Sequence, residues 1–195
     1  MQRRKLLQSG ATALTATMGA GLLGSCTIRR EETSTTNLNL PKVRWRMATS
    51  WPYSLDTIYG GAETISQRVD ALSGGKFQIT AYAAGELVPG LEVLDAVQAG
   101  SVECGHTASY YYIGKNPAFA FGTSLPFGLT AQQQNSWLYE AGGNAAMNRI
   151  YNDFGVIGFP AGNTGAQMGG WVKRKLNGLN SLQGLKMRIP GLGGK

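Results

Sequence analysis

The side chains that most often carry out catalysis are scarce in this sequence. His106 is the single histidine, and Cys26 and Cys104 are the two cysteines. A Ser-His-Asp triad or a histidine-rich metal site would therefore depend on one candidate residue. Cys104 lies in an apolar stretch and is expected to pack as a small core residue. This inventory favours a binding protein over an enzyme.

Arg188 lies near the end of a short predicted strand. Apolar and basic residues alternate from Leu185 to Ile189, which predicts a short strand that ends at Pro190. If the apolar residues face the core, Arg188 projects from the opposite side at the end of the strand, where ligands collect in open α/β sheets. A guanidinium offers a planar fork of donors that suits a carboxylate.

The first 26 residues have the layout of a bacterial export signal. Arg3, Arg4 and Lys5 form a basic start, and no charged side chain follows between Leu6 and Cys26. Adjacent arginines indicate the twin-arginine route, although an ordinary export signal with two arginines is an alternative. The stretch is too short, and too rich in small residues, for a good membrane span. We expect the protein to act in the periplasm.

The end of this signal resembles a lipobox. The small residues of Leu22 to Ser25 lead directly to Cys26, which would become an acylated N-terminus. A plain signal cut at a small residue nearby is the alternative. Acyl chains contribute about 0.8 kcal/mol per buried methylene and would anchor the protein at a membrane. Residues 27–42, rich in Thr, Asn and charge, are then expected to form a flexible tether.

The charge of the chain does not favour a nucleic-acid partner. The formal net charge is +7 and falls to about +4 once Arg3, Arg4 and Lys5 leave with the signal. The longest basic run after the signal, Lys173 to Lys175, is typical of a solvated turn. A mildly positive protein attracts small anions instead.

Strand-like and helix-like segments alternate between residues 43 and 108. Strands are predicted at residues 43–47, 77–83 and 102–108 from their apolar patterns. An apolar stripe predicts a helix over residues 55–72 that Gly74 and Gly75 close, and Pro89-Gly90 opens a short helix that ends at Gly100. This order predicts an α/β fold with a mostly parallel sheet.

The sequence is less regular after residue 108. Residues 110–127 mix aromatic residues, Gly and Pro, which indicates a long loop or crossover. Thr130 and Gln133 match a capping box, so a helix is expected to run from there toward Tyr151. Gly142-Gly143 should weaken this helix in its middle.

The C-terminal part of the sequence contains two further apolar segments. Short strands are predicted at residues 156–159 and 167–172. Because an α/β unit that ends on a strand normally continues into a helix, we expect the natural chain to extend beyond Lys195.

Four separate segments resemble the extracytoplasmic solute receptors of tripartite ATP-independent periplasmic (TRAP) transporters. Three of them are residues 45–52 (WRMATSWP), 91–100 (LEVLDAVQAG) and 181–191 (SLQGLKMRIPG). The fourth, residues 111–119 (YYIGKNPAF), resembles the subgroup that binds 2-oxo acids such as pyruvate. The resemblance extends over nearly all of residues 43–195.

This resemblance implies a two-lobed α/β fold of the periplasmic-binding-protein type. Such a receptor closes on a small carboxylate and delivers it to the TRAP permease. Members of the family are longer than this chain, so we expect an incomplete receptor with four parts. These are the signal at 1–26, the tether at 27–42, the first lobe at 43–155, and the crossover and start of the second lobe at 156–195. A homodimer is compatible with the family.

The resemblance also assigns two ligand-binding residues. Arg188 would pair with the substrate carboxylate, and Gln167 would help to hold the ligand and a cation. An amide oxygen suits Na⁺ or Ca²⁺, and no covalent cofactor is expected. The alternatives are a surface arginine bonded to an acid and an ordinary strand glutamine. Residues that either line the cleft or pack in the core are left unassigned: Tyr110, Tyr111, Tyr112, Trp51 and Asn163.

Two other functions remain open. The twin-arginine route often serves cofactor-loaded oxidoreductases, so an exported enzyme is the alternative from a different class. The scarcity of histidine and cysteine and the lack of a phosphate-binding glycine motif count against it. A sensor built on the same receptor fold is the third hypothesis.

Overall fold

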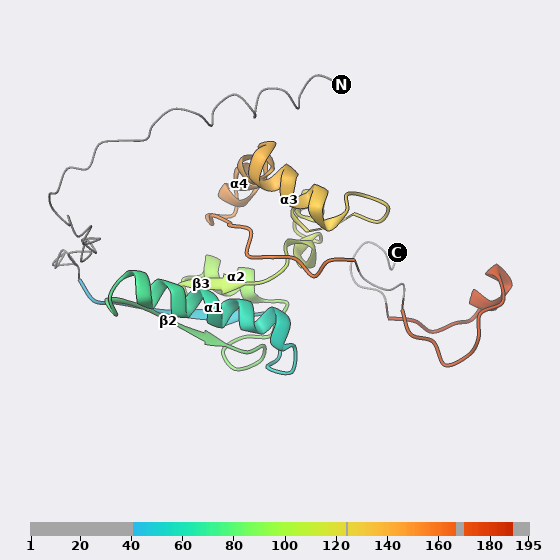
Figure 1. The fold of residues 1–195 in the computed structure, drawn as a ribbon, viewed down its shortest axis with the longest axis horizontal. Coiled ribbons are helices and arrows are strands. Elements are labelled where there is room, and N and C mark those ends of the chain that lie inside the picture. Colours follow the sequence, from blue (N-terminus) through green and yellow to red (C-terminus); the bar gives the residue numbers. More distant parts are fainter. Residues whose placement is uncertain (1–40, 124, 167–169, 189–195) are drawn as a thin grey trace, which may run out of the picture. The chain divides into compact units, whose positions relative to one another are not determined.

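A small parallel sheet forms the base of the fold. The computed structural model describes residues 41–123, 125–166 and 170–188. Its three strands are β1 (Val43–Thr49), β2 (Phe77–Tyr82) and β3 (Cys104–His106). Both neighbours run parallel to β1, in the order β2-β1-β3 (Figure 1). The predicted alternation of strands and helices in a parallel α/β sheet is confirmed.

Helix α1 (Asp56–Leu72) connects β1 to β2, and Figure 1 shows it running along the sheet. It buries Tyr59 and Ala62 on the face toward the strands. The Tyr59 hydroxyl donates to the Ala81 carbonyl oxygen in β2 at 3.2 Å. The helix ends before Gly74, whose φ of 59° is the left-handed backbone that the glycine pair predicts.

Helix α2 (Val93–Gln98) connects β2 to β3. Its Val93 and Ala96 form a buried cluster with Ala48 of β1 and with Val102, which precedes β3. Because fully burying an apolar side chain contributes about 1.5–3 kcal/mol, this cluster holds the short helix on the sheet.

Helical segments continue the chain after β3. They are the 3₁₀ helices Ser109–Tyr112 and Pro117–Gly122, α3 (Ala131–Glu140), α4 (Gly143–Asn152) and the 3₁₀ helix Leu179–Leu182. The predicted capping box of Thr130 and Gln133 opens α3. The helix expected to reach Tyr151 is two helices, because Gly142 has a φ of 79° and interrupts it.

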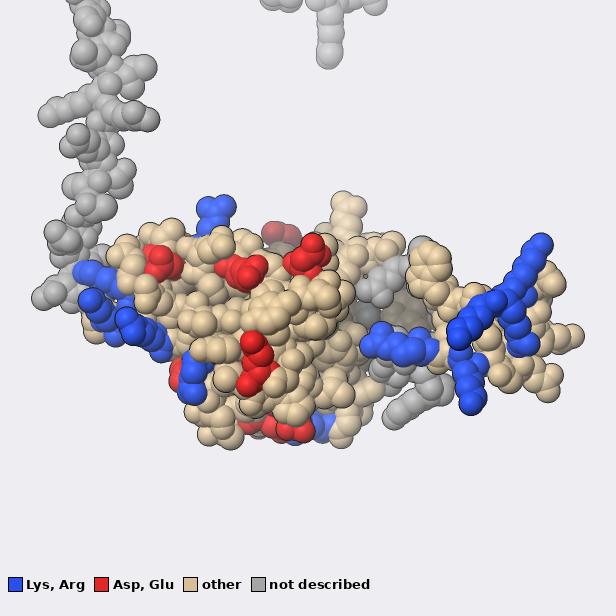
Figure 2. Space-filling view, turned by 90° about the horizontal axis from the view of Figure 1, so that it is seen from below, with Lys and Arg blue, Asp and Glu red and all other residues tan. Residues whose placement is uncertain are grey.

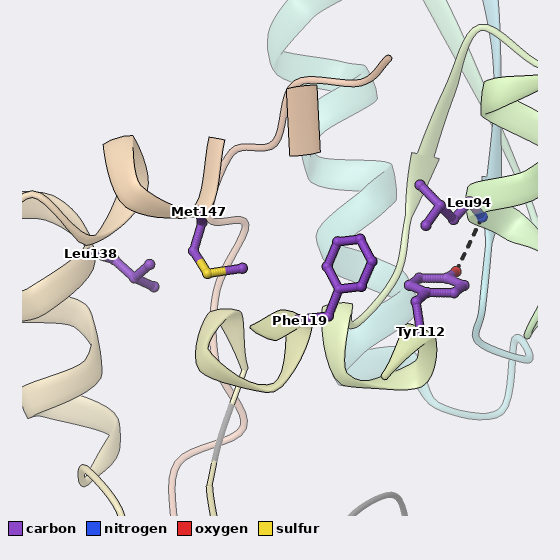
Figure 3. Close-up of a cluster of buried hydrophobic side chains, with 5 residues drawn as sticks. All are labelled: Leu94, Tyr112, Phe119, Leu138 and Met147. Atoms are coloured by element: carbon purple, nitrogen blue, oxygen red, sulfur yellow. Dashed lines mark hydrogen bonds between the residues drawn. The ribbon is translucent and has the colours of Figure 1, made fainter. Parts of the chain in front are cut away.

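A buried cluster joins α2 to the helical segments between Ser109 and Asn152. Its members are Leu94, Tyr112, Phe119, Leu138 and Met147 (Figure 3). Phe119 has 0 % of its surface exposed, and its ring stacks 5.7 Å from the ring of Tyr151. The segment predicted as a loop or crossover therefore supplies part of the core.

Two predicted strands do not form in the described residues. Residues 156–159 and 185–188 have no strand partner. Ile157 and Phe159 are 67 % and 74 % exposed, so no sheet covers this apolar run. A strand requires a neighbouring backbone to pair its N–H and C=O groups, and the sequence pattern alone does not supply one.

One further predicted strand is shorter in the structure, and another lies partly outside the described residues. Only Cys104–His106 of the strand predicted at residues 102–108 pairs with β1. Of the strand predicted at residues 167–172, residues 167–169 lie outside the described residues, and residues 170–172 are not in a strand.

Candidate functional site

The carboxyl ends of β1 and β3 lie where a ligand site is expected. The chain adds β2 on one side of β1 and β3 on the other, which makes this edge a topological switch point. Ser50 and Trp51 follow β1, while His106 ends β3 and Thr107 follows it. The Ser50 amide donates to the His106 carbonyl oxygen at 3.0 Å, so the two strand ends are side by side.

A directed chain of hydroxyl groups holds these strand ends together. Ser50 Oγ donates to the Gly90 carbonyl oxygen at 2.5 Å and lies 2.5 Å from Thr107 Oγ1. Thr107 Oγ1 lies 2.9 Å from the Tyr112 hydroxyl, which accepts from the Leu94 amide at 3.2 Å. Each hydroxyl has one proton, so Thr107 donates to Ser50 and Tyr112 donates to Thr107. The chain links both strand ends to the start of α2.

Trp51 is held at this edge through its backbone and its indole ring. Its carbonyl oxygen accepts from the Ala84 amide at 2.9 Å and from Thr49 Oγ1 at 3.1 Å. Its indole Nε1 donates to Nδ1 of His106 at 3.1 Å. The indole ring also packs against Tyr111, with centroids 5.7 Å apart. Burial lowers the pKa of His106, which favours the neutral imidazole that this bond requires.

Arg188 is exposed, and its positive charge is one of the smaller influences on the pKa of the Tyr111 hydroxyl. Burial and then a hydrogen bond with Tyr110 raise the pKa of the Tyr111 hydroxyl, whereas the positive charge of Arg188 acts to lower this pKa. The structure does not place Arg188 at the end of a strand as predicted, because residues 185–188 form no strand.

The remaining residues singled out from the sequence either lie outside the described residues or have other partners. Gln167 and Cys26 lie outside the described residues. Asn163 is exposed, and its Nδ2 donates to Oδ1 of Asn135 in α3 at 3.3 Å. Cys104 is partly buried, and burial raises the pKa of its thiol to about 11, in line with a packing role.

Trp51 and His106 are the residues whose partnership the sequence patterns did not predict. Considered alone, His106 is expected to be a structural histidine, and Trp51 has no assigned role. The available signal was that both lie close to the ends of strands predicted at residues 43–47 and 102–108. Only the register that pairs Thr49 with His106 shows that these ends are adjacent.

Lys and Arg side chains gather in two groups in Figure 2, one of them beside the first described residues. Figure 2 shows Lys and Arg side chains gathered over the C-terminal described segment, which contains Lys173, Arg174 and Lys175. Arg174 Nη2 donates to the carbonyl oxygens of Ser181 at 2.7 Å and Gln183 at 3.2 Å. Arg174 thus holds the loop that leads to Gln183, and the three basic residues are exposed, as predicted for a solvated run.

The described residues do not form a metal site from charged ligands. Across residues 41–123, 125–166 and 170–188, no three His, Cys, Asp or Glu side chains come together in a way that would hold an ion. A cation would therefore need neutral donors, or ligands from residues outside the described ranges.

Comparison with known proteins defines the family. Residues 47–194 match the bacterial extracellular solute-binding proteins of family 7. The chain belongs to this family. Across 195 residues it is 60 % identical to a monocarboxylate 2-oxoacid-binding periplasmic protein of Nostoc sp., which covers 100 % of this chain and 52 % of the relative.

Two solved TRAP solute-binding proteins share the fold of this family 7 chain. The protein of Bordetella bronchiseptica has a TM-score of 0.76 and 49 % identity, over 80 % of this chain and 46 % of its own. It is a mixed-occupancy dimer with copurified calcium and picolinate. The protein of Pseudoalteromonas atlantica, with bound sodium and pyruvate, has a TM-score of 0.74 and 39 % identity, over 78 % and 46 % of the two chains.

These comparisons confirm the predicted TRAP receptor family and its α/β periplasmic-binding-protein fold. The family 7 chain spans about half the length of the relatives that it matches. Among its described helices, none has the length and apolar character needed to span a membrane.

Proposed function

We propose that this chain is part of a periplasmic TRAP receptor for a small monocarboxylate, a 2-oxo acid of the size of pyruvate. The match of residues 47–194 to the family 7 solute-binding proteins carries this proposal. The ligand class is supported by the Nostoc relative, named for monocarboxylate 2-oxo acids, and by the Pseudoalteromonas protein with bound pyruvate. The function is affinity and closure, without a covalent step.

The proposed site has a charged side and an aromatic side, which contact opposite ends of the ligand. Arg188 binds the carboxylate through two parallel hydrogen bonds, for which its planar fork is suited. Tyr111 stays protonated, because burial raises its pKa, and offers its hydroxyl as a donor. The paired rings of Trp51 and Tyr111 face the carbon end of the ligand. A small organic acid has both a charge and an apolar end and fits this division.

Gln167 is the second proposed ligand-binding residue. Its amide oxygen is a neutral donor that suits Na⁺ or Ca²⁺, the ions in the Pseudoalteromonas and Bordetella proteins. A bound cation would add positive charge beside the ligand oxygens. The described residues do not complete such a site, so the binding of the carboxylate by Arg188 is proposed independently of the ion.

The whole receptor would act at the outer side of the inner membrane. Residues 1–26 direct export by the twin-arginine route, and lipidation of Cys26 with the tether of residues 27–42 keeps the protein at the membrane. Residues 43–155 form the first lobe, and residues 156–195 begin the second. The partners are the TRAP permease and, as in the Bordetella protein, a second copy of the receptor.

Substitution of Arg188 tests the proposal. In the protein expressed from its complete reading frame, Arg188→Ala should weaken pyruvate binding by about 2–5 kcal/mol in calorimetry. Arg188→Lys should bind with intermediate affinity, because it keeps the charge and loses the fork. Lys186→Ala, at an exposed basic residue two positions away, is the matched control and should bind as the wild type does.

Two results would reject the proposal. Unchanged affinity in Arg188→Ala would remove this residue from the site. Conversion of pyruvate to a product during the titration would favour the exported enzyme, whereas recovery of unchanged pyruvate after saturable binding supports the receptor.

A further inference from the structure

We propose that His106 is a positioning residue that orients the Trp51 indole toward the ligand. This inference rests on the proposed function, because it takes the edge formed by Trp51 and Tyr111 as the ligand-facing wall. His106 would not touch the ligand. It would act by fixing the angle of the ring that does.

The hydrogen bond between the two rings defines the state of the imidazole. Trp51 Nε1 is a donor only, so Nδ1 of His106, 3.1 Å away, must be the acceptor. The neutral imidazole therefore carries its proton on Nε2. The two rings meet edge to face, with centroids 6.2 Å apart and an interplanar angle of 72°. This geometry specifies one orientation of the indole.

His106 is itself fixed on several sides. Its backbone is paired with Thr49 in the sheet, and its carbonyl oxygen accepts from Ser50. On the α1 side, a Cβ atom at Gly61 would lie 3.7 Å from Cε1 of His106, so the backbone of the helix packs close to the imidazole. His106 is thus a rigid support against which the indole is held.

The orientation of Trp51 matters because its ring forms a wall with Tyr111. Their centroids lie 5.7 Å apart with an interplanar angle of 49°. A wall with a fixed orientation on one side of the ligand limits the room for the carbon chain of that ligand. We therefore infer that His106 contributes to the preference for short 2-oxo acids over longer ones.

Three substitutions test this role in the protein from the complete reading frame. His106→Leu removes the acceptor, whereas the amide oxygen of His106→Asn takes the place of Nδ1. Trp51→Phe removes the donor and assigns the Trp51 indole N–H signal among the four tryptophans in a ¹H–¹⁵N spectrum. Trp45→Phe, at a tryptophan in the first half of β1, is the control.

We expect His106→Leu to shift the Trp51 indole signal and to weaken pyruvate binding about tenfold, the effect of losing one hydrogen bond. It should also reduce the ratio of affinities for pyruvate and for an oxo acid two carbons longer. His106→Asn should restore both the signal and most of the affinity. In the Trp51→Phe background, His106→Leu should have no further effect on binding, and Trp45→Phe should leave both measurements unchanged.

The inference fails if the indole signal of Trp51 is the same in His106→Leu and in the wild type. It also fails if His106→Asn loses as much affinity as His106→Leu while its indole signal is native. The spectrum is recorded without ligand, so it reports the orientation of Trp51 even if pyruvate does not bind. Failure of the proposed function appears separately, as absent pyruvate binding in the wild type or normal binding in Arg188→Ala.

Discussion

The two sides of the proposed site are built differently. The aromatic side follows the strand ends, where Trp51 is held by its backbone and by His106. Arg188 instead belongs to an exposed, irregular segment, in which the neighbouring Met187 is 37 % exposed. A site on a rigid scaffold keeps its geometry without a ligand, whereas a group on an irregular segment gains its position by docking. We infer that the wall formed by Trp51 and Tyr111 limits the size of the ligand. Arg188 binds the carboxylate as its segment docks.

The largest expected effect comes from removing the core beneath the aromatic side. Phe119→Ala should lower the free energy of unfolding by about 3–5 kcal/mol, because the ring is fully buried and leaves a cavity. Trp171→Ala, a similar truncation at an 87 % exposed residue of the C-terminal segment, should change it by less than about 0.5 kcal/mol. Urea denaturation measures both. Equal losses in the free energy of unfolding would show that the two regions do not differ in packing.

A smaller effect is expected from interrupting the hydroxyl chain. Thr107→Val keeps the shape of the side chain but leaves Ser50 without its donor and Tyr112 without its acceptor. The free energy of unfolding should fall by about 1–3 kcal/mol in the same denaturation assay. Thr64→Val is the control, because the hydrogen bond from Thr64 Oγ1 to the Gly60 carbonyl oxygen of the same helix is exposed to solvent. A Thr107 variant as stable as this control would show that the chain of hydroxyl groups does not contribute to stability.

The smallest effect is a dependence of stability on pH. Burial lowers the pKa of His106 below 6.5, so protonation is less favourable in the folded protein than in the unfolded chain. The free energy of unfolding should be at its full value above pH 6.5, fall as the pH drops through the folded pKa, and then level off. His106→Asn should abolish this decline in denaturation curves recorded between pH 8 and about 5.

A second titration at lower pH provides the contrast. Hydrogen bonds from Arg46 lower the pKa of Glu103 from 4.5 to about 2. Its contribution to stability is present above pH 4.5 and lost as the pH falls toward about 2. Glu103→Gln should remove this lower decline and leave the one near pH 6.5. Loss of both declines in either variant would show that the two groups do not titrate independently.

The elements predicted well from the sequence are those set by neighbouring residues. The apolar stripe of α1, the glycines that follow it and the capping box of Thr130 each depend on contacts within a few residues. The same local information showed that Gly142 is a weak point in the helix. It did not show that the helix breaks there, because that depends on how α3 and α4 pack on the core.

The features that were missed depend on distant parts of the chain. Residues 156–159 have the composition of a strand but no neighbouring strand among the described residues. The bond between Trp51 and His106 depends on the register of β1 and β3, which an alternating pattern does not define. The position of Arg188 was predicted through a strand that does not form among the described residues.

A crystal structure of the protein from its complete reading frame with bound pyruvate tests the central claim most directly. We expect both carboxylate oxygens about 2.7–2.9 Å from the guanidinium nitrogens of Arg188. The methyl end should rest on the rings of Trp51 and Tyr111. Pyruvate bound at another part of the molecule, with Arg188 exposed to solvent, would contradict the proposed function.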